Sequence, residues 1–91
     1  MAFTLSGVED LRLAFGRRIR ELRRDQQLTQ EDLAERAGLH WTYVSGVERG
    51  QRAPSLDVVG RLANGLNVTP AELFGALKRQ YRSRFRSRVK G

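Results

Sequence analysis

The feature of this sequence that most limits its fold is a pair of short helical segments separated by a very short turn. Thr29 and Asp32 form a Thr-x-x-acid pattern, which is typical of the first turn of a helix. Gly38 follows the last apolar residue of that segment and can adopt the left-handed conformation that often ends a helix. A second segment is predicted from Trp41 to Arg49, and Gly50 ends it. The chain must therefore turn sharply between two short helices.

Two helices joined in this way are typical of the helix-turn-helix motif, and a longer helix is predicted before them. It begins at the N-cap Ser6 and ends at Gln26 and Gln27. Gly16 lies inside it and marks either close packing or a break. The apolar positions of this helix recur at steps of three and four, as one face of a helix requires: Val8, Leu11, Phe15, Ile19 and Leu22.

Two more helices are predicted after the motif. Ser55 is the N-cap of the fourth, and Thr69, Pro70 and Glu72 combine three start signals for the fifth. The inward residues of the motif and of the fourth helix are expected to be Leu33, Ala34, Ala37, Val44, Val47, Leu56, Val59, Leu62, Ala63 and Leu66. The fifth helix places Leu73, Phe74, Leu77 and Tyr81 on one side. The prediction is an all-α domain of five helices.

The positive charge of the chain is concentrated at its end. The net charge is +7, yet residues 1–74 contain ten basic and ten acidic residues, so the whole excess lies in 75–91. We divide the chain into an N-terminal arm (1–5), a helical domain (6–77) and a basic extension (78–91) that continues the fifth helix or forms a tail. A basic segment on a neutral body favours a polyanionic partner, nucleic acid before an anionic membrane. The alternative is a solvated tail that aids solubility.

Several functional classes find little support in the residue types. The chain has no cysteine and a single histidine, His40, so a thiolate or zinc site is not expected. No paired carboxylates, Cys–His pair or glycine-rich phosphate loop stands at a catalytic spacing, so we expect neither an enzyme nor a cofactor. Apolar runs are too short to span a bilayer. The first residues lack the basic and apolar regions of a signal peptide, so a cytoplasmic, nucleoid-associated protein is expected.

Residues 15–74 resemble the lambda-repressor/Cro-like, or Xre, family of helix-turn-helix proteins. The stretches that carry the resemblance are 19–23 (IRELR), 28–34 (LTQEDLA), 37–38 (AG), 43–45 (YVS), 47–50 (VERG), 54–56 (PSL), 62–63 (LA) and 72–74 (ELF). Within the family, residues 41–50 are most similar to the controller proteins of restriction–modification systems. The resemblance implies a compact five-helix lambda-repressor-like domain that binds double-stranded DNA.

The resemblance also implies roles for individual residues. Gln30 would hold a phosphate, helped by the helix N-terminus. Base edges would be read by Trp41, Thr42, Ser45 and Gly46, with Tyr43, Arg49 and Arg52 beside them toward the DNA backbone. Short polar side chains on the exposed face of a helix suit a base-reading role in the major groove.

These residues could also have roles unrelated to DNA binding. Gln30, Thr42 and Ser45 could be ordinary surface positions, Tyr43 could pack against the fourth helix, and the two arginines could form weak surface ion pairs. Trp41 departs from the small polar or basic residue usual in the family. Its indole would contact either thymine methyl groups or the sugar–phosphate backbone.

Two further expectations concern assembly. By resemblance, Arg23 and Glu48 would form a partly buried ion pair that fixes the angle of the recognition helix. Phe74, Leu77 and Tyr81 are candidates for a homodimer interface, unless the first two belong to the monomer core. The function expected is a dimeric transcriptional regulator on an inverted repeat. The alternatives are an antitoxin with a protein partner, or an architectural DNA binder that acts through its basic tail.

Overall fold

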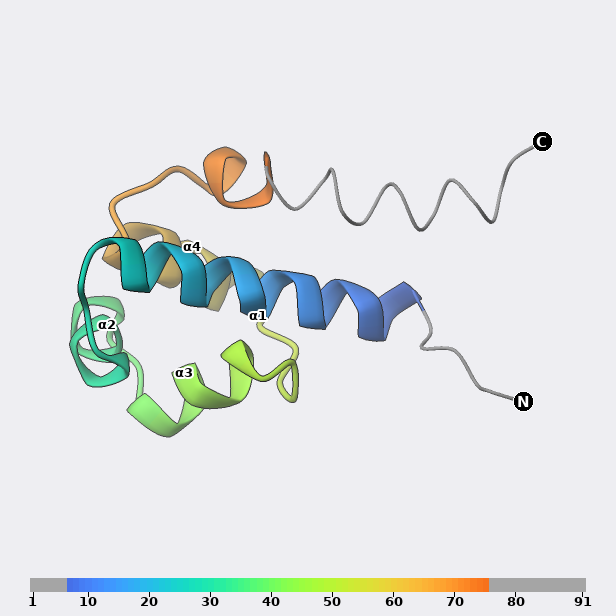
Figure 1. Ribbon diagram of the computed structural model, residues 1–91, viewed down its shortest axis with the longest axis horizontal. Helices are drawn as coiled ribbons and strands as arrows, with labels where there is room; N and C mark the ends of the chain where they lie inside the picture. The colour runs from blue at the N-terminus through green and yellow to red at the C-terminus, as the bar shows by residue number, and fades with distance from the viewer. Residues whose placement is uncertain (1–6, 76–91) are drawn as a thin grey trace.

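The computed structural model describes residues 7–75, with side chains from Leu11 onward. It contains α1 (Gly7–Asp25), α2 (Gln30–Ala37), α3 (Trp41–Glu48) and α4 (Leu56–Gly65). Residues 70–75 are also helical and begin the fifth helix. In Figure 1, α1 runs across the molecule between the fifth helix and α3. The predicted all-α, five-helix architecture is confirmed.

The helix ends follow the capping signals of the sequence. Thr29 and Asp32 form a complete capping box, in which each side chain accepts a hydrogen bond from the other residue's backbone N–H. Thr69 and Glu72 repeat this arrangement at the start of the fifth helix. Gly38 ends α2 with φ of 70°, a left-handed conformation that glycine adopts without steric cost. Gly38 thus ends α2 where the short turn to α3 begins.

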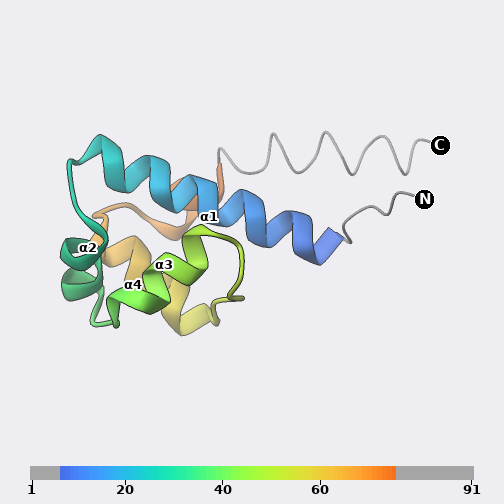
Figure 2. The same cartoon turned by 60° about the horizontal axis from the view of Figure 1, so that its bottom comes forward.

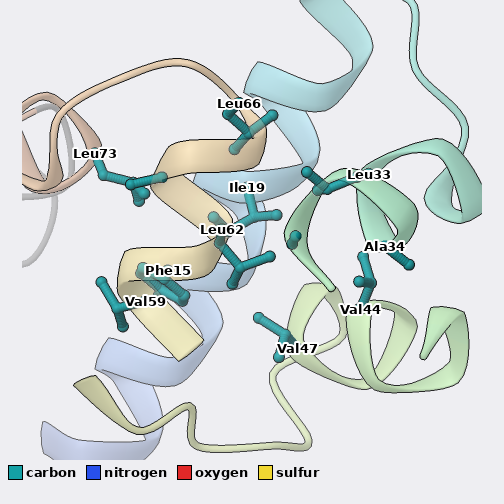
Figure 3. Packing of buried hydrophobic residues seen from close by; sticks show 12 residues of the cluster. Phe15, Ile19, Leu33, Ala34, Val44, Val47, Val59, Leu62, Leu66 and Leu73 are labelled. Carbon is teal, nitrogen blue, oxygen red and sulfur yellow. The ribbon is translucent and has the colours of Figure 1, made fainter. Parts of the chain in front are cut away.

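One hydrophobic core joins all the helices (Figure 3). Helix α2 packs against both α3 and α4, while α1 packs along α3. The fully buried side chains come from every helix of the described region: Ile19, Leu33, Val44, Val47, Leu62, Leu66 and Leu73. Because α3 packs on both α1 and α2, and α2 in turn on α4, the orientation of α3 depends on the other three helices.

Gly16 is the point of closest approach between α1 and α3. A Cβ atom at this position would lie 2.3 Å from the carbonyl oxygen of Val47 and 2.6 Å from that of Glu48. Helix α1 continues without interruption through Gly16. Of the two interpretations that the sequence allowed, close packing is therefore the correct one.

Two apolar positions of these helices are exposed. Leu56 is 87% exposed, because it is the first residue of α4 and lies before the turn that contacts the core. The prediction that Leu56 faces inward was wrong. Leu11, on the apolar face predicted for α1, is 37% exposed. The N-terminal turns of α1 extend past the other described helices (Figure 2).

Some predictions fall outside the described residues. They concern the cap at Ser6, the side chain of Val8, the positions Leu77 and Tyr81, and the basic extension (78–91). Within residues 7–75, no helix is both long and apolar enough to cross a membrane.

Candidate nucleic-acid interface

Helix α3 is tied to α1 by a buried ion pair. Nε of Arg23 donates to Oε2 of Glu48 at 2.6 Å, and Nη2 donates to Oε1 at 3.0 Å. A third donor of the same guanidinium, Nη1, reaches the carbonyl oxygen of Leu28 in the loop before α2 at 2.8 Å. Three elements that meet near the motif are thus held by one side chain, in the fork geometry that makes arginine–carboxylate pairs strong.

The hydrogen bonds to Glu48 raise the pKa of Arg23 above its ordinary value. Burial acts in the opposite direction, and the nearby carboxylate charge adds to the increase. The guanidinium therefore keeps its charge beside Glu48. The expected pairing of these residues at the α1–α3 contact is present in the structure.

Gln30 joins the same network. It is the first residue of α2, it is half-buried, and its Nε2 donates to Oε1 of Glu48 at 3.0 Å. An amide nitrogen carries two hydrogens, so one N–H remains for an outside acceptor such as a phosphate. Gln30 is thus attached to the end of α3 as well as standing at the N-terminus of α2.

The N-terminal end of α3 presents two exposed side chains, Trp41 and Thr42. Trp41 is 44% exposed and its ring stacks on that of His40, with centroids 6.2 Å apart. His40 is the N-cap of α3: its Nδ1 accepts the backbone N–H of Thr42 and lies 2.7 Å from the Thr42 hydroxyl. His40 therefore fixes the backbone and side chain of Thr42 and supports one face of Trp41.

Tyr43 is half-buried and packs against the hydrophobic core. The guanidinium of Arg52 lies over its ring, 5.3 Å from the centroid, within the range of a cation–π interaction. The ring of Tyr43 therefore contacts the core and also supports an exposed arginine.

Ser45 was predicted to lie on the exposed face of α3, but the structure buries it. It is only 8% exposed, and its hydroxyl accepts a hydrogen bond from Nη1 of Arg49. Nε and Nη2 of Arg49 both donate to Oε1 of Gln51, at 3.3 and 3.1 Å. Ser45 and Gln51 thus hold the exposed Arg49 between them.

Gly46 is also buried, contrary to prediction, because the side chain of Arg52 covers it. The period of a helix placed Ser45 and Gly46 opposite Val44 and Val47, but it carried no information about the loop that folds back over α3. Arg49 and Arg52 both contact neutral partners. Among the described residues, the ion pairs are Arg18–Glu21 and Arg23–Glu48.

Two residues that shape this surface were not predicted from the sequence. His40 is the N-cap of α3, a position more often occupied by Ser, Thr, Asp or Asn. Gln51 supports Arg49 from the loop after α3, and nothing in the sequence pattern marks it. His40 could have been found from its place directly before the first helical residue.

Phe74 lies apart from this surface, on the fifth helix. Its ring stacks on that of Phe15 with centroids 5.5 Å apart, and it remains 38% exposed. One face of Phe74 therefore belongs to the monomer, and the other is open to solvent. Of the three predicted interface residues, it is the one that the structure describes.

The surface formed by α3 and its following loop suits binding to a polyanion. An exposed indole and a hydroxyl stand at the helix N-terminus, and two exposed arginines lie beside them, each with its guanidinium already positioned. No cluster of three potential metal ligands occurs in the part of the chain that the structure describes. The surface of α3 and its following loop provides hydrogen-bonding groups, an apolar ring and positive charge.

Comparison with known proteins identifies the same region. The helix-turn-helix family matches residues 19–73. The control protein C.BamHI of Bacillus amyloliquefaciens is 40% identical over 65 residues, which cover 70% of this chain and 80% of that protein.

Two solved structures have the same fold. The restriction–modification controller protein C.AhdI of Aeromonas hydrophila has a TM-score of 0.68 and 51% identity, over 69% of this chain and 96% of that chain. The controller protein C.Esp1396I, solved as a tetramer with its natural 35-base-pair operator, has a TM-score of 0.73 and 31% identity, over 78% and 93% of the two chains. The chain belongs to the helix-turn-helix family and is related to the controller proteins of restriction–modification systems.

Proposed function

We propose that this protein is a sequence-specific, double-stranded DNA-binding transcriptional regulator that acts as a dimer on an inverted-repeat operator. Helix α3 would lie in the major groove, with Trp41 and Thr42 at the base edges. Arg49, Arg52 and Gln30 would contact the phosphates on either side. The proposal assigns a binding function, and no covalent chemistry is needed for it.

The observation that carries the proposal is the rigid support of α3 beneath an exposed reading surface. The Arg23–Glu48 pair, the Gln30 amide and the core hold the helix from three sides. Its exposed N-terminal residues then extend from a fixed backbone, as base recognition requires. The relative C.Esp1396I was solved on operator DNA, which supports the same kind of partner for this chain.

A single short helix contacts too few base pairs to select one site, so a two-fold dimer is the usual solution. The exposed face of Phe74, together with Leu77 and Tyr81, is the proposed interface. A regulator of this kind would act in the cytoplasm, on the nucleoid.

A randomised duplex library tests the proposal. The purified full chain is allowed to select from the library at near-physiological salt, and the retained DNA is sequenced. The expected result is an inverted repeat whose half-sites lie about one helical turn apart. Retention of DNA without any enriched sequence would overturn the proposal.

The concentration of charge in 75–91 favours a second candidate, an architectural DNA binder that acts through the tail. Replacement of the lysines and arginines of 78–91 by glutamine, which keeps Tyr81, distinguishes the two. A tail-driven binder would lose affinity for all sequences, and the dependence of binding on salt would flatten because fewer counterions are released. The regulator proposed above would keep its sequence preference without the charge of the tail.

A further inference from the structure

Gly46, in the middle of α3, lies directly beneath the side chain of Arg52. A Cβ atom at Gly46 would approach Cγ of Arg52 to 2.7 Å, a distance that real Cβ atoms do not tolerate. Nε and Cδ of Arg52 would lie 3.4 and 3.6 Å away. The aliphatic part of the Arg52 side chain therefore passes over Gly46, where α3 has no side chain to block it.

The far end of Arg52 lies over the ring of Tyr43, three residues before Gly46 and on the same side of the helix. Tyr43 is itself anchored in the core. The chain reaches this arrangement by turning at Gly50, whose φ is 75°, so that the loop folds back along α3. The arginine thus has two supports, the bare backbone of Gly46 under its stem and the tyrosine ring under its guanidinium.

We propose that Gly46 is a positioning residue for DNA binding, which acts by keeping open the space that Arg52 occupies. The part of this inference that concerns DNA rests on the proposed function. A long arginine side chain loses conformational freedom when it binds a phosphate, and that loss weakens binding. Because Arg52 is already held on Tyr43, less freedom remains to be lost.

The geometry at Gly46 differs from that at the other tight glycine of the domain. At Gly16 an added Cβ would meet backbone carbonyl oxygens, which cannot move without shifting a helix. At Gly46 it would meet Cγ of the exposed Arg52 side chain, which can move away by rotation about its Cα–Cβ bond when it gives up its contact with Tyr43. The variant Gly46→Ala should therefore fold, and alanine also favours the helix.

Gly60 provides a matched control. It lies in α4, it is exposed, and no atom outside its own helix lies within 4 Å of an added Cβ. Gly60→Ala therefore makes the same chemical change in a helix without displacing any side chain.

The first measurement needs no DNA. In the free wild-type protein the ring of Tyr43 should shift the NMR signals of the Arg52 Cγ and Cδ protons. Gly46→Ala should move these signals to the values of a freely rotating arginine, whereas Gly60→Ala should leave them unchanged. Unaltered Arg52 signals in a folded Gly46→Ala protein would overturn the inference.

The second measurement uses the DNA selected from the library, and compares the wild type with Gly46→Ala, Arg52→Ala and the double variant. We expect Gly46→Ala to weaken binding roughly two- to tenfold, the cost of ordering one long side chain. In the Arg52→Ala background the same change should have no further effect, because residues that act through one contact are not additive.

The outcomes separate the inference from the proposed function. A wild-type protein that selects no DNA sequence contradicts the proposed function and, with it, the DNA-binding part of the inference. If the wild type binds selectively and Gly46→Ala binds as tightly, the positioning role of Gly46 is wrong. An equally large loss in the Arg52→Ala background also contradicts that role, because Gly46 would then act through another group.

Discussion

Arg23 and Glu48 meet at the contact between α1 and α3 through two hydrogen bonds, with Nε and Oε2 2.6 Å apart. Both side chains are buried, and Glu48 is the last residue of α3. The pair therefore attaches the end of α3 to α1, the longest helix among the described residues. Gln30 adds a third hydrogen bond from the start of α2, so the two helices of the motif share one carboxylate.

Removal of one partner should strongly destabilise the domain. Arg23→Met leaves a buried carboxylate without its cation, and the free energy of unfolding should fall by about 3–5 kcal/mol. Urea denaturation followed by circular dichroism measures the loss. The double variant Arg23→Met/Glu48→Met should recover much of it, because no unpaired charge remains buried. A single variant as stable as the wild type would show that the pair contributes little.

Alanine at Gly16 should also destabilise the domain, despite its better helix propensity. The added Cβ would meet two carbonyl oxygens of α3 at 2.3 and 2.6 Å, so α1 and α3 must separate. We expect a loss of about 1–3 kcal/mol, as for other overpacked sites. Gly60→Ala, in open space, should instead stabilise by about 0.5–1 kcal/mol. Equal effects of the two substitutions in urea denaturation would contradict the close approach at Gly16.

Thr42 should contribute to selectivity rather than to general affinity. Thr42→Ala should weaken binding to the selected operator by about 1–3 kcal/mol and leave binding to random DNA unchanged. Thr42→Ser keeps the hydroxyl that lies 2.7 Å from His40 Nδ1 and should retain most of the selectivity. Titration by fluorescence anisotropy on both duplexes measures the difference. Equal losses of affinity on the two duplexes would show that Thr42 does not contribute to sequence selectivity.

Asp32 should make the stability of the domain sensitive to acid. The hydrogen bond from the backbone N–H of Thr29, followed by its side-chain contact, lowers the pKa of Asp32 below its ordinary value of 3.8. A lowered folded-state pKa contributes stability above the unfolded-state value, and this contribution is lost as the pH falls through the folded-state value. The carboxyl is fully exposed, so solvent screens the effect.

The variant Asp32→Asn tests this assignment. It should be less stable than the wild type near neutral pH, and the two proteins should become more alike as the pH falls below about 4. Thermal denaturation at a series of pH values provides the measurement. A constant difference in stability between the two proteins across that range would show that the Asp32 charge does not contribute.

The helix boundaries were determined by the sequence itself, because their causes are local. Thr29 with Asp32, Thr69 with Glu72, and Gly38 act on backbone groups within a few residues. A hydrogen bond between near neighbours depends little on distant segments, so the starts of α2 and of the fifth helix could be predicted. The apolar period of α1 and α4 likewise identified most of the core residues. Leu11 and Leu56 match this period but are exposed in the structure.

The exposure of residues on and around α3, in contrast, was decided by tertiary structure. Nothing in the sequence says that the loop after α3 folds back, so Ser45 and Gly46 could be placed on a helix face but not known to be covered. The same holds for Gln30, whose amide meets a carboxylate 18 residues further along the chain. Capping depends on neighbours in the chain, whereas exposure depends on which distant segment packs on a residue. That packing follows from how the whole core closes.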